Sequence, residues 1–427
     1  MNEAQTRLQN LVDERLPALG TLLGPEAPGL LGAAVEAAGA SLVSARPLQV
    51  QWQPGRALSV VYETLLEDTP RGTVRDMLVA ATGDRLPAGA MLLEQGAERV
   101  AVWHLMNDPA LPGLAIALDP DQLREMLPTL GVGAGEIRLR LRAYRPQRRA
   151  VVEVTAGDAR LFIKVVRPKR VAALQHRHAL LSAHLPTPRS HGWSPELGLV
   201  VLEAMPGATL RDVLSAREGA LPAPEQIAAL LDKLPAPEDG RRTPDARATV
   251  AQSADLLGRL LPDLQPSLAA LSDGLAAEGG QGGPEVPVHG DLHDGQLTVL
   301  DGRITGLLDV DTAGLGHRVD DWANLAGHLA TRLQAMPGHL QPRLQAYGRQ
   351  IAALADGQAH PATFRRRVAA VVLALATGPF RVQSADWPEE TRMRVALAAA
   401  WLESAQRTYH TYRVGQPHTQ TEGVQIT

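Results

Sequence analysis

Carboxylate and amide side chains near residue 300 have the types and the spacing to hold a metal ion beside phosphates. Residues 286–326 read VPVHGDLHDGQLTVLDGRITGLLDVDTAGLGHRVDDWANLA. Asp291 and Asp309 contribute carboxylates and Gln296 contributes an amide oxygen, which are the hard oxygen ligands that Mg²⁺ prefers. A magnesium ion held there would bridge the phosphates of a nucleotide and neutralise charge as a phosphoryl group moves. The stretch therefore predicts phosphoryl-transfer chemistry.

A hairpin is expected to bring these side chains together. Asp301-Gly302 is a strong signal for a two-residue turn between two short strands. A regular register around that turn places Gln296 opposite Leu307. The glutamine and Asp309 would then emerge at the same open end of the hairpin, with the first aspartate in the loop just before it.

These residues carry a family resemblance. His289-Gly290-Asp291, Gln296 five residues later, and Leu308-Asp309 resemble the signature of the aminoglycoside phosphotransferase family, which includes choline, fructosamine and maltose kinases. Asp320-Asp321-Trp-Ala resembles the end of the same signature. The resemblance implies a fold similar to that of protein kinases. It also implies transfer of the γ-phosphoryl group of ATP, with Mg²⁺, to a hydroxyl of a small molecule such as a sugar, an amino sugar or an aminoglycoside-like compound.

The resemblance assigns roles to residues near the signature. Asp291 would accept the proton of the substrate hydroxyl, and Asp309 and Gln296 would bind magnesium. Gln296 stands where the family usually carries asparagine, and maltokinases resemble this sequence in carrying glutamine there. His289 and Asp321 would be structural.

Two further stretches resemble the nucleotide-binding parts of the family. Lys164 in FIKVV resembles the strand lysine that pairs with nucleotide phosphates, and Glu203-Ala204-Met205 resembles the hinge whose backbone holds adenine. The sequence also departs from the pattern. Residues 144–151 contain no glycine where a Gly-rich loop would lie, and the helix after Lys164 has no glutamate. The side chains left to replace that glutamate are Gln175, His176 and His178, unless phosphate alone holds the lysine.

The elements around the site divide into a sheet-rich part and a helical part. Strand patterns at 160–166 and 197–203 flank a helix opened by Pro168, and the chain after residue 209 reads as helices. We therefore expect an α+β, protein-kinase-like two-lobe fold with a small antiparallel-sheet N-lobe and a large helical C-lobe. The expected units are a cap-like α/β extension at 1–130, an N-lobe ending in the hinge at 131–205, a C-lobe with the catalytic loop at 206–415 and a disordered tail at 416–427. A helical pattern opens the chain at roughly 3–23, and residues 248–271 and most of 319–412 are expected to be helices.

Two stretches of the sheet-rich part repeat each other. QWQPGRALSVVYE and RAYRPQRRAVVEV align on Pro54 and Pro146, so that Trp52 matches Tyr144. The match predicts two sheets entered by similar hairpins. Chance similarity between two short hairpins explains it equally well.

Composition limits the class of protein. The chain has 427 residues, 45% of them hydrophobic, a net charge of −4 and no cysteine. The length suits two or three folding units, and the charge argues against a nucleic-acid-binding protein. Disulfides and thiolate metal sites are excluded, which fits a reducing compartment. The longest apolar run, at 368–377, is too short to span a bilayer. We expect a cytoplasmic enzyme, monomeric or homodimeric, that binds a small hydroxyl acceptor and neither nucleic acid nor a membrane.

Two other functions fit parts of the sequence. A metallophosphoesterase would use the His289–His293 run as metal ligands, but that chemistry wants further His and Asn ligands that the chain lacks in such a context. A non-catalytic nucleotide-binding scaffold is favoured by the missing helix glutamate and opposed by the intact Asp291 and Asp309.

The acceptor is less constrained by the sequence. Acidic side chains near the C-terminus could form a pocket for an aminoglycoside or amino sugar, although a solvated helix face explains them equally well: Asp386, Glu389, Glu390 and Glu403.

Overall fold

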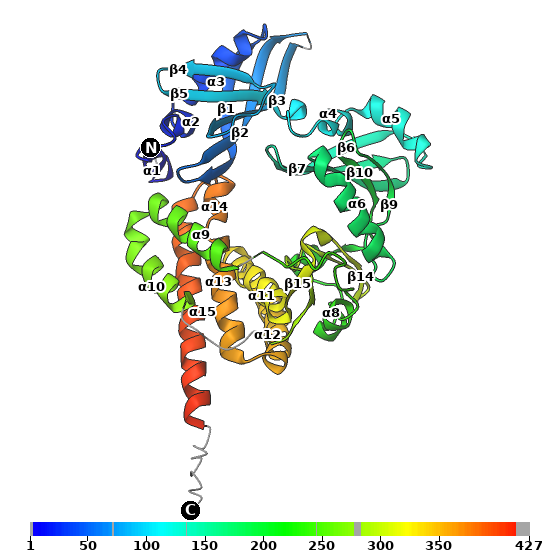
Figure 1. The fold of residues 1–427 in the computed structure, drawn as a ribbon, viewed down its shortest axis with the longest axis vertical. Helices are drawn as coiled ribbons and strands as arrows, with labels where there is room; N and C mark the ends of the chain where they lie inside the picture. Colours follow the sequence, from blue (N-terminus) through cyan, green and yellow to red (C-terminus); the bar gives the residue numbers. More distant parts are fainter. Residues whose placement is uncertain (1–2, 71, 134, 245, 277–282, 416–427) are drawn as a thin grey trace, which may run out of the picture.

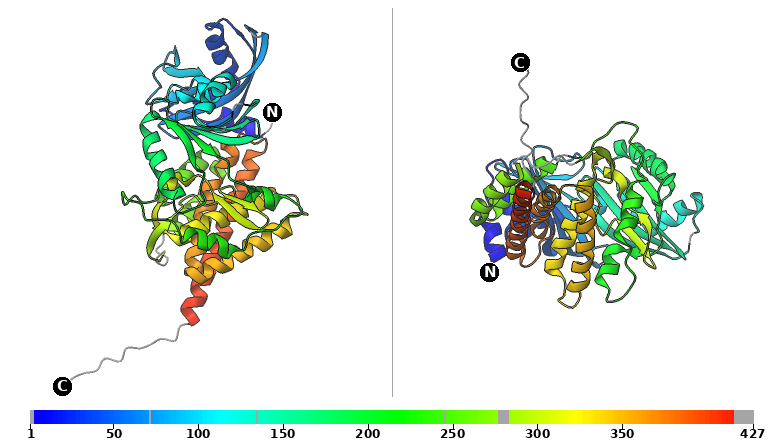
Figure 2. Two further views of the ribbon diagram at one scale, coloured as in Figure 1. Left: turned by 90° about the vertical axis from the view of Figure 1, so that its right-hand side faces the viewer. Right: turned by 90° about the horizontal axis from the view of Figure 1, so that it is seen from below.

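The chain folds into two antiparallel sheets followed by a helical lobe (Figure 1). The computed structural model describes residues 3–70, 72–133, 135–244, 246–276 and 283–415. The tail predicted at 416–427 lies outside these residues. Figure 2 shows the sheets stacked above the helical lobe, with the last helix running away from them. No helix within the described ranges is both long and apolar enough to cross a bilayer.

The first sheet has five strands in the order β1-β2-β3-β5-β4. The strands are β1 (Ser41–Gln53), β2 (Ala57–Thr69), β3 (Gly72–Gly83), β4 (Met91–Gln95) and β5 (Glu98–His104). Two helices, α2 (Leu19–Leu23) and α3 (Ala27–Glu36), cover one face, where Leu19 and Leu31 join a core with Val60 and Tyr62.

The helical pattern predicted at roughly 3–23 is confirmed only at the two ends of that range. Helix α1 (Glu3–Gln9) ends well before α2, and an irregular segment separates them. Within that segment, Asp13 accepts hydrogen bonds from Trp52 Nε1 at 3.2 Å and from the backbone N–H of Gly55 at 2.7 Å. Since these bonds hold the β1–β2 turn, the segment serves a tertiary contact that helical periodicity does not reveal.

The second sheet repeats the first in strand order, β6-β7-β8-β10-β9. Its elements are α4 (Gly113–Ala117), α5 (Pro120–Thr129), β6 (Ile137–Arg145), β7 (Arg149–Ala156), β8 (Ala159–Val166), α6 (Pro168–Ser182), β9 (Ser190–Ser194) and β10 (Leu199–Glu203). Helices α4 and α5 cover one face through Leu114 and Leu123, which pack with Val152 and Ile163. The opposite face is left for the cleft described below.

The two sheet units share a buried carboxylate at the same place. Asp108 accepts hydrogen bonds from the Tyr144 hydroxyl and from the backbone N–H of Gln147, both at 2.7 Å, as Asp13 does for the first hairpin. The two aspartates begin the related runs DERLPAL and DPALPGL. The predicted pair of sheets entered by similar hairpins is therefore confirmed, and the likeness extends to the segment before each helix pair.

The helical lobe carries a small hairpin on which the catalytic loop depends. Its helices are α7 (Leu210–Ser215), α8 (Pro224–Leu231), α9 (Ala246–Leu260), α10 (Gln265–Ala276), α11 (Arg318–Ala335), α12 (Gln341–Gln358), α13 (Pro361–Leu375), α14 (Gly378–Arg381) and α15 (Trp387–Gly415). Its strands are β11 (Ala208–Thr209), β12 (Glu285–Val288), β13 (Leu297–Leu300), β14 (Arg303–Leu307) and β15 (Gly314–His317). The helical structure predicted at 248–271 is divided between α9 and α10, because Pro262 opens a short 3₁₀ turn between them.

The first sheet unit also contacts the helical lobe directly. Phe380 and Trp387, which flank the α14–α15 connection, are buried in the same core as the residues of α2 and β1. Their rings meet edge to face with centroids 5.3 Å apart. The N-terminal unit is thus packed against α14 as well as against the second sheet.

Candidate active site

The β13–β14 hairpin forms as predicted at its turn and differs in its register. Asp301 and Gly302 both adopt positive φ, 51° and 73°, as a two-residue hairpin turn requires. The predicted pairing of Gln296 with Leu307 is wrong, since Leu297 pairs with Leu307 after a shift between Thr298 and Val299.

A contact from outside the hairpin accounts for this shift. The hydroxyl of Thr305, the unpaired residue, donates to the carbonyl of Pro206 at 2.6 Å, which fixes a bulge there. The carbonyl of Gln296 still accepts a hydrogen bond from Leu308 N at 2.7 Å, so Gln296 and Asp309 do lie at one end of the hairpin.

Two buried residues hold the catalytic loop. The carboxylate of Asp321 accepts the backbone N–H groups of His289 and Gly290, each at 2.9 Å. The His289 ring bridges the loop to the hairpin, because Nε2 lies 2.9 Å from the Leu308 carbonyl and Nδ1 accepts from Asp291 N at 3.2 Å. These bonds fix the backbone of Asp291 relative to Leu308, the neighbour of Asp309. The arrangement supports the structural roles expected for His289 and Asp321.

Lys164 meets two carboxylates across the cleft. Its Nζ lies 2.7 Å from Asp309 Oδ1 and 2.5 Å from Asp311 Oδ2, and the lysine side chain is only 6% exposed. Arg149 reaches Asp309 as well, at 3.3 Å. Burial opposes ionisation of Asp309, but the charges of Lys164 and Arg149 hold its pKa well below the usual range. Asp309 is therefore ionised at neutral pH and is paired with both cations.

Asp311 supplies the second carboxylate that pairs with Lys164, whereas α6 supplies none. Of the three α6 side chains considered for that role, His176 pairs with Glu238 at the surface. The side-chain oxygen of Gln175 is buried and has no hydrogen-bond partner among the described residues. His178 is buried and lines the cleft, and burial followed by the charge of Lys164 lowers its pKa. The carboxylate beside Lys164 instead comes from the Asp-Val-Asp stretch after β14, a spacing that the sequence displays but does not assign.

The cleft between the second sheet and the hairpin has a volume of about 640 Å³. Apolar walls come from Val151, Phe162, Leu202, Met205 and Leu308. The predicted residues that line it are Lys164, Glu203, Met205, Gln296 and Asp309. A concave, mostly apolar site with a few convergent polar groups is the usual form of a small-molecule site.

Asp291 lies outside the lining of this cleft, in the loop beside it. Its Oδ1 accepts a hydrogen bond from Asn324 Nδ2 of α11 at 3.4 Å. Asn324 was not among the predicted residues. The D-D-W-A-N spacing, which places it one turn after Asp321 on the same helix, was the available signal.

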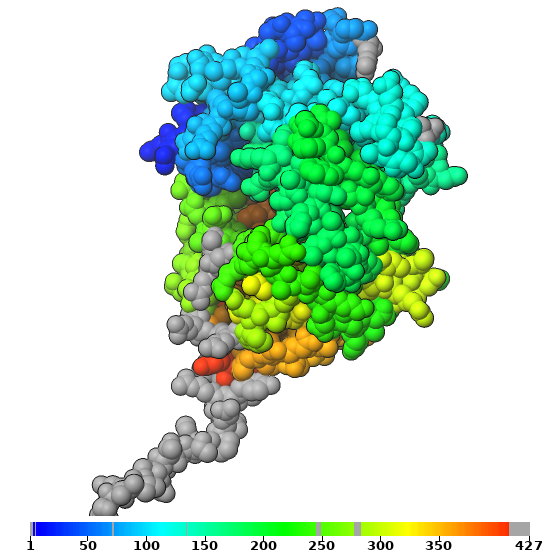
Figure 3. All heavy atoms as spheres, turned by 45° about the vertical axis from the view of Figure 1, so that its right-hand side comes forward, coloured from blue at the N-terminus to red at the C-terminus, as the bar shows by residue number. Residues whose placement is uncertain are grey.

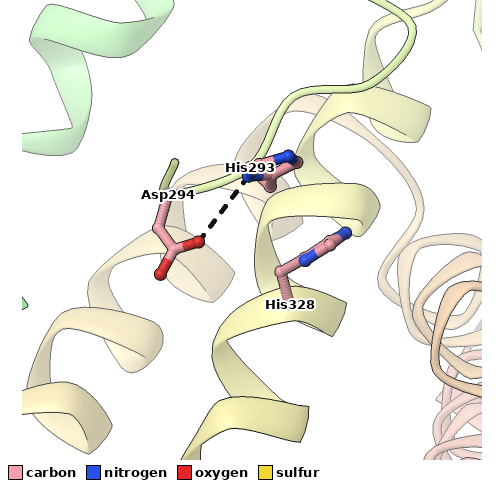
Figure 4. Close-up of side chains that lie close together, drawn as sticks. All are labelled: His293, Asp294 and His328. Atoms are coloured by element: carbon pink, nitrogen blue, oxygen red, sulfur yellow. Dashed lines mark ion pairs between the residues drawn. The ribbon is translucent and has the colours of Figure 1, made fainter. Parts of the chain in front are cut away.

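A second group of titratable side chains lies behind the catalytic loop (Figure 4). The rings of His293 and His328 stack with centroids 4.5 Å apart, and His293 Nδ1 is 3.7 Å from Asp294. Arg211 and Arg332 both pair with the buried Asp294 carboxylate, at 2.9 and 2.5 Å. Burial and the nearby His293 lower the pKa of His328 to about 3. Two guanidinium groups already neutralise the Asp294 carboxylate. We therefore interpret this cluster as structural, holding the loop in place.

A comparison with models of known families matches the part of the chain that contains this site. Residues 141–359 match the phosphotransferase enzyme family. No curated protein matches the chain.

Several solved structures of low sequence identity match this chain over nearly their whole length. Macrolide 2′-phosphotransferase MphH from Brachybacterium faecium is 20% identical over 64% of this chain and 98% of that chain, with a TM-score of 0.42. A putative aminoglycoside phosphotransferase from Ralstonia eutropha is 15% identical over 68% and 98%, with a TM-score of 0.47. A choline/ethanolamine kinase family protein from Mesorhizobium loti is 17% identical over 69% and 99%, with a TM-score of 0.46.

The predicted α+β fold is confirmed, with an antiparallel-sheet lobe followed by a helical lobe as in protein kinases. The segment 141–359 spans more than half of the 427 residues and contains the cleft, the catalytic loop and the hairpin. The chain therefore belongs to the phosphotransferase enzyme family.

Proposed function

We propose that this phosphotransferase moves the γ-phosphoryl group of ATP to a hydroxyl of a small molecule, with magnesium and with Asp291 as the catalytic base. The observation that carries the proposal is the convergence on one cleft of Lys164 and Asp309, 2.7 Å apart, beside the locked loop that holds Asp291. Lys164 lies in the sheet lobe and Asp309 in the helical lobe. Kinase-like enzymes bind the nucleotide phosphates between two lobes in this way.

The donor set fits a magnesium ion. Asp309 and Gln296 line the cleft and offer the carboxylate and amide oxygens expected. Asp311, which shares Lys164 with Asp309, offers a further carboxylate oxygen. Asp311 Oδ1 is buried and has no hydrogen-bond partner in the described part of the chain. A buried carboxylate oxygen without a partner is costly unless a cation satisfies it. A magnesium ion bound there would neutralise charge on the transferred phosphoryl group.

The chain's own residues would position the reactants. Asp291, held by its backbone and by Asn324, would orient the acceptor hydroxyl and accept its proton as the oxygen attacks phosphorus. Lys164 would exchange part of its contact with Asp309 and Asp311 for the nucleotide phosphates. Catalysis would then rest on positioning and charge neutralisation, without a covalent phosphoenzyme.

The test measures ADP formation from ATP and from GTP with Mg²⁺, across sugars, amino sugars, aminoglycosides and choline. Asp291→Asn keeps the shape of the side chain and removes the base. We expect acceptor-stimulated turnover to fall at least about 100-fold in that variant, while ATP affinity stays within about threefold. Loss of nucleotide binding along with turnover would show that the role assigned to Asp291 is wrong. Tight Mg-ATP binding without turnover by any acceptor would favour a nucleotide-binding scaffold.

A further inference from the structure

The glycine-free tip of the β6–β7 hairpin has no backbone N–H left for a ligand. In protein kinases a Gly-rich loop covers the nucleotide phosphates at this place, and the backbone N–H groups of such loops bind phosphate oxygens. Here Pro146 carries no N–H, and the N–H of Gln147 donates to Asp108 at 2.7 Å. The N–H of Arg148 donates to the carbonyl of Arg145 at 3.0 Å. Phosphate binding at this hairpin therefore depends on side chains.

The same tip is held from both sides. Gln147 adopts a positive φ of 58°, and its carbonyl accepts a hydrogen bond from Arg167 Nε at 2.6 Å. The carboxylate of Asp108, on the other side, is itself fixed by the Tyr144 hydroxyl at 2.7 Å. Without glycine the turn has little freedom to change its dihedral angles, so we expect it to keep this shape and not to fold down over a triphosphate.

Arg149, the first residue of β7, lies on the same face of the second sheet as Lys164. In the register of the sheet, Val151 lies opposite Lys164, and side chains two positions apart on a strand share a face. Arg149 and Val151 both line the cleft, while Ala150 between them is buried in the core that α4 and α5 cover. Arg149 Nη1 lies 3.3 Å from Asp309 Oδ2, on the carboxylate whose other oxygen is 2.7 Å from Lys164 Nζ. The contact crosses from the sheet lobe to the helical lobe, between which Figure 3 shows the surface hollowed.

The guanidinium group of Arg149 holds only a share of one carboxylate. Asp309 is its one ion-pair partner in the described part of the chain, and Lys164 binds the same carboxylate more closely. Lys164 also has a second partner in Asp311. Of the five N–H donors of Arg149, only those of Nη1 reach a hydrogen-bond acceptor among the described residues. The remaining donors are free to bind an oxyanion supplied by a ligand.

We propose that Arg149 binds the phosphates of the nucleotide through its side chain, in place of the backbone N–H groups of a Gly-rich loop. This inference rests on the proposed function of the same cleft, of which it needs the nucleotide site. Arg149 and Lys164 meet on one carboxylate from neighbouring strands, so a phosphate bound by the lysine lies within reach of the arginine. Arginine suits this task because its planar fork donates two hydrogen bonds to one phosphate.

The experiment compares ligands that share a base and differ in phosphate: adenosine, AMP, ADP and a non-hydrolysable ATP analogue. Binding is titrated by calorimetry on the full chain with Mg²⁺. We expect Arg149→Gln to weaken binding of the ATP analogue at least about tenfold and that of adenosine by less than about twofold, because the lost hydrogen bonds reach only phosphate oxygens. Arg149→Lys, which keeps the charge without the planar fork, should lose less affinity than Arg149→Gln.

Arg148→Gln is the matched control, because it removes the same charge from the next position along the chain. Arg148 is exposed and does not line the cleft. This variant should bind all four ligands as the wild type does. Denaturation midpoints of the two glutamine variants check that both are folded.

Three results would overturn the inference. The first is equal affinity of the wild type and Arg149→Gln for the ATP analogue. The second is an equal loss for adenosine, which would assign Arg149 to the shape of the cleft. The third is a loss of the same size in Arg148→Gln, which would mean that the overall charge near the cleft attracts the nucleotide.

Turnover separates this inference from the proposed function. Acceptor-stimulated turnover that is unchanged in Arg149→Gln, with an unchanged KM for ATP, and that disappears in Asp291→Asn would sink this inference and leave the proposed function standing. Failure of the wild type to bind any of these nucleotides would overturn both.

Discussion

At the scale of single residues, the ion pair of Lys164 with Asp311 changes how the nucleotide lysine is held. Protein kinases use a glutamate on the helix that follows the lysine strand. Here α6 provides no glutamate, and the carboxylate comes from the stretch after β14, 2.5 Å from Nζ. The position of Lys164 is therefore tied to the stretch after β14 and not to movement of α6.

Asp311→Asn tests this substitution of partners. We expect affinity for Mg-ATP to fall about tenfold or more, because a buried lysine loses one of its two carboxylates and the site loses a charged oxygen. Equilibrium binding with and without Mg²⁺ measures the loss. Glu238→Gln, which removes the partner of exposed His176 on the same helix, should leave affinity unchanged.

A second variant distinguishes the loss of the carboxylate that pairs with Lys164 from a general loss of negative charge in the site. His178 is the buried α6 side chain on which the charge of Lys164 acts, so its position is the one from which a glutamate could reach the lysine. His178→Glu should therefore recover part of the binding lost in Asp311→Asn. Unchanged affinity in the single Asp311→Asn variant would contradict the assignment, whatever the double variant does.

Local signals in the sequence predict part of this site and miss the rest. The turn at Asp301-Gly302 and the oxygen ligands follow from residue type and short spacing. The register shift does not, because Thr305 bonds to Pro206 roughly a hundred positions earlier in the chain. The roles of Asn324 and Asp311 likewise depend on packing between separate elements.

At the scale of elements, each sheet unit uses one buried aspartate to clasp its hairpin. Asp13 binds Trp52 and Gly55, and Asp108 binds Tyr144 and Gln147. Only the second hairpin carries an arginine that lines the cleft. The duplicated clasp therefore offers a matched pair of substitutions with different functional consequences.

Asp108→Ala and Asp13→Ala should destabilise the chain to a similar extent, about 2–3 kcal/mol each, because both leave buried donors without an acceptor. Chemical denaturation measures this loss. We expect only Asp108→Ala to raise the KM for ATP, by several-fold, since its hairpin positions Arg149. An equal rise in KM for both variants would mean that stability alone controls nucleotide affinity.

The first sheet contains an ion pair that predicts a pH dependence of stability. His104 Nδ1 lies 2.6 Å from Asp76 Oδ2, and this bond raises the pKa of His104 above its usual 6.5. Although burial opposes it, the same bond lowers the pKa of Asp76 below 3.8. The histidine's contribution is complete below pH 6.5 and is lost as pH rises through its folded pKa. The aspartate's contribution is complete above pH 3.8 and is lost as pH falls through its folded pKa.

The pair should therefore stabilise the chain most between about pH 4 and 6.5. Both side chains are about one-third exposed, so the effect should stay near 1 kcal/mol or less. Denaturation curves across pH for the wild type and for His104→Gln measure it. Parallel pH profiles for the two proteins would rule out the linkage.

The extent of the duplication was only partly visible in the sequence. Matching hairpins revealed two sheets, because Pro54 and Pro146 mark turns in similar strands. The helix pairs before each sheet share little beyond the DxxLPxL run, since many apolar sequences can cover a sheet face. The packing of α4 and α5 on the second sheet leads us to propose a boundary between the first two units near residue 105.

At the scale of the whole molecule, the first sheet unit packs directly against α14 of the helical lobe. Phe380 and Trp387 are buried in its core, Arg392 of α15 pairs with Glu3 at 2.7 Å, and Asp263 of the helical lobe pairs with Arg7 at 3.2 Å. These ion pairs are exposed and contribute little, so the apolar contact holds most of the interface. Such a long-range contact leaves no periodic trace in the sequence.

Phe380→Ala tests whether this contact shapes the acceptor site. The loss of a buried ring should cost about 3–5 kcal/mol of stability. Because Phe380 packs the helical lobe against the core of the first sheet unit, we also expect the KM for the acceptor to rise several-fold while the KM for ATP stays unchanged. Phe364→Ala is the matched control, since Phe364 is equally buried but packs against Trp401 within the helical lobe. It should destabilise the chain as much without changing the KM for the acceptor. If both variants weaken acceptor and nucleotide alike, α14 is an ordinary part of the core, and the N-terminal unit serves stability alone.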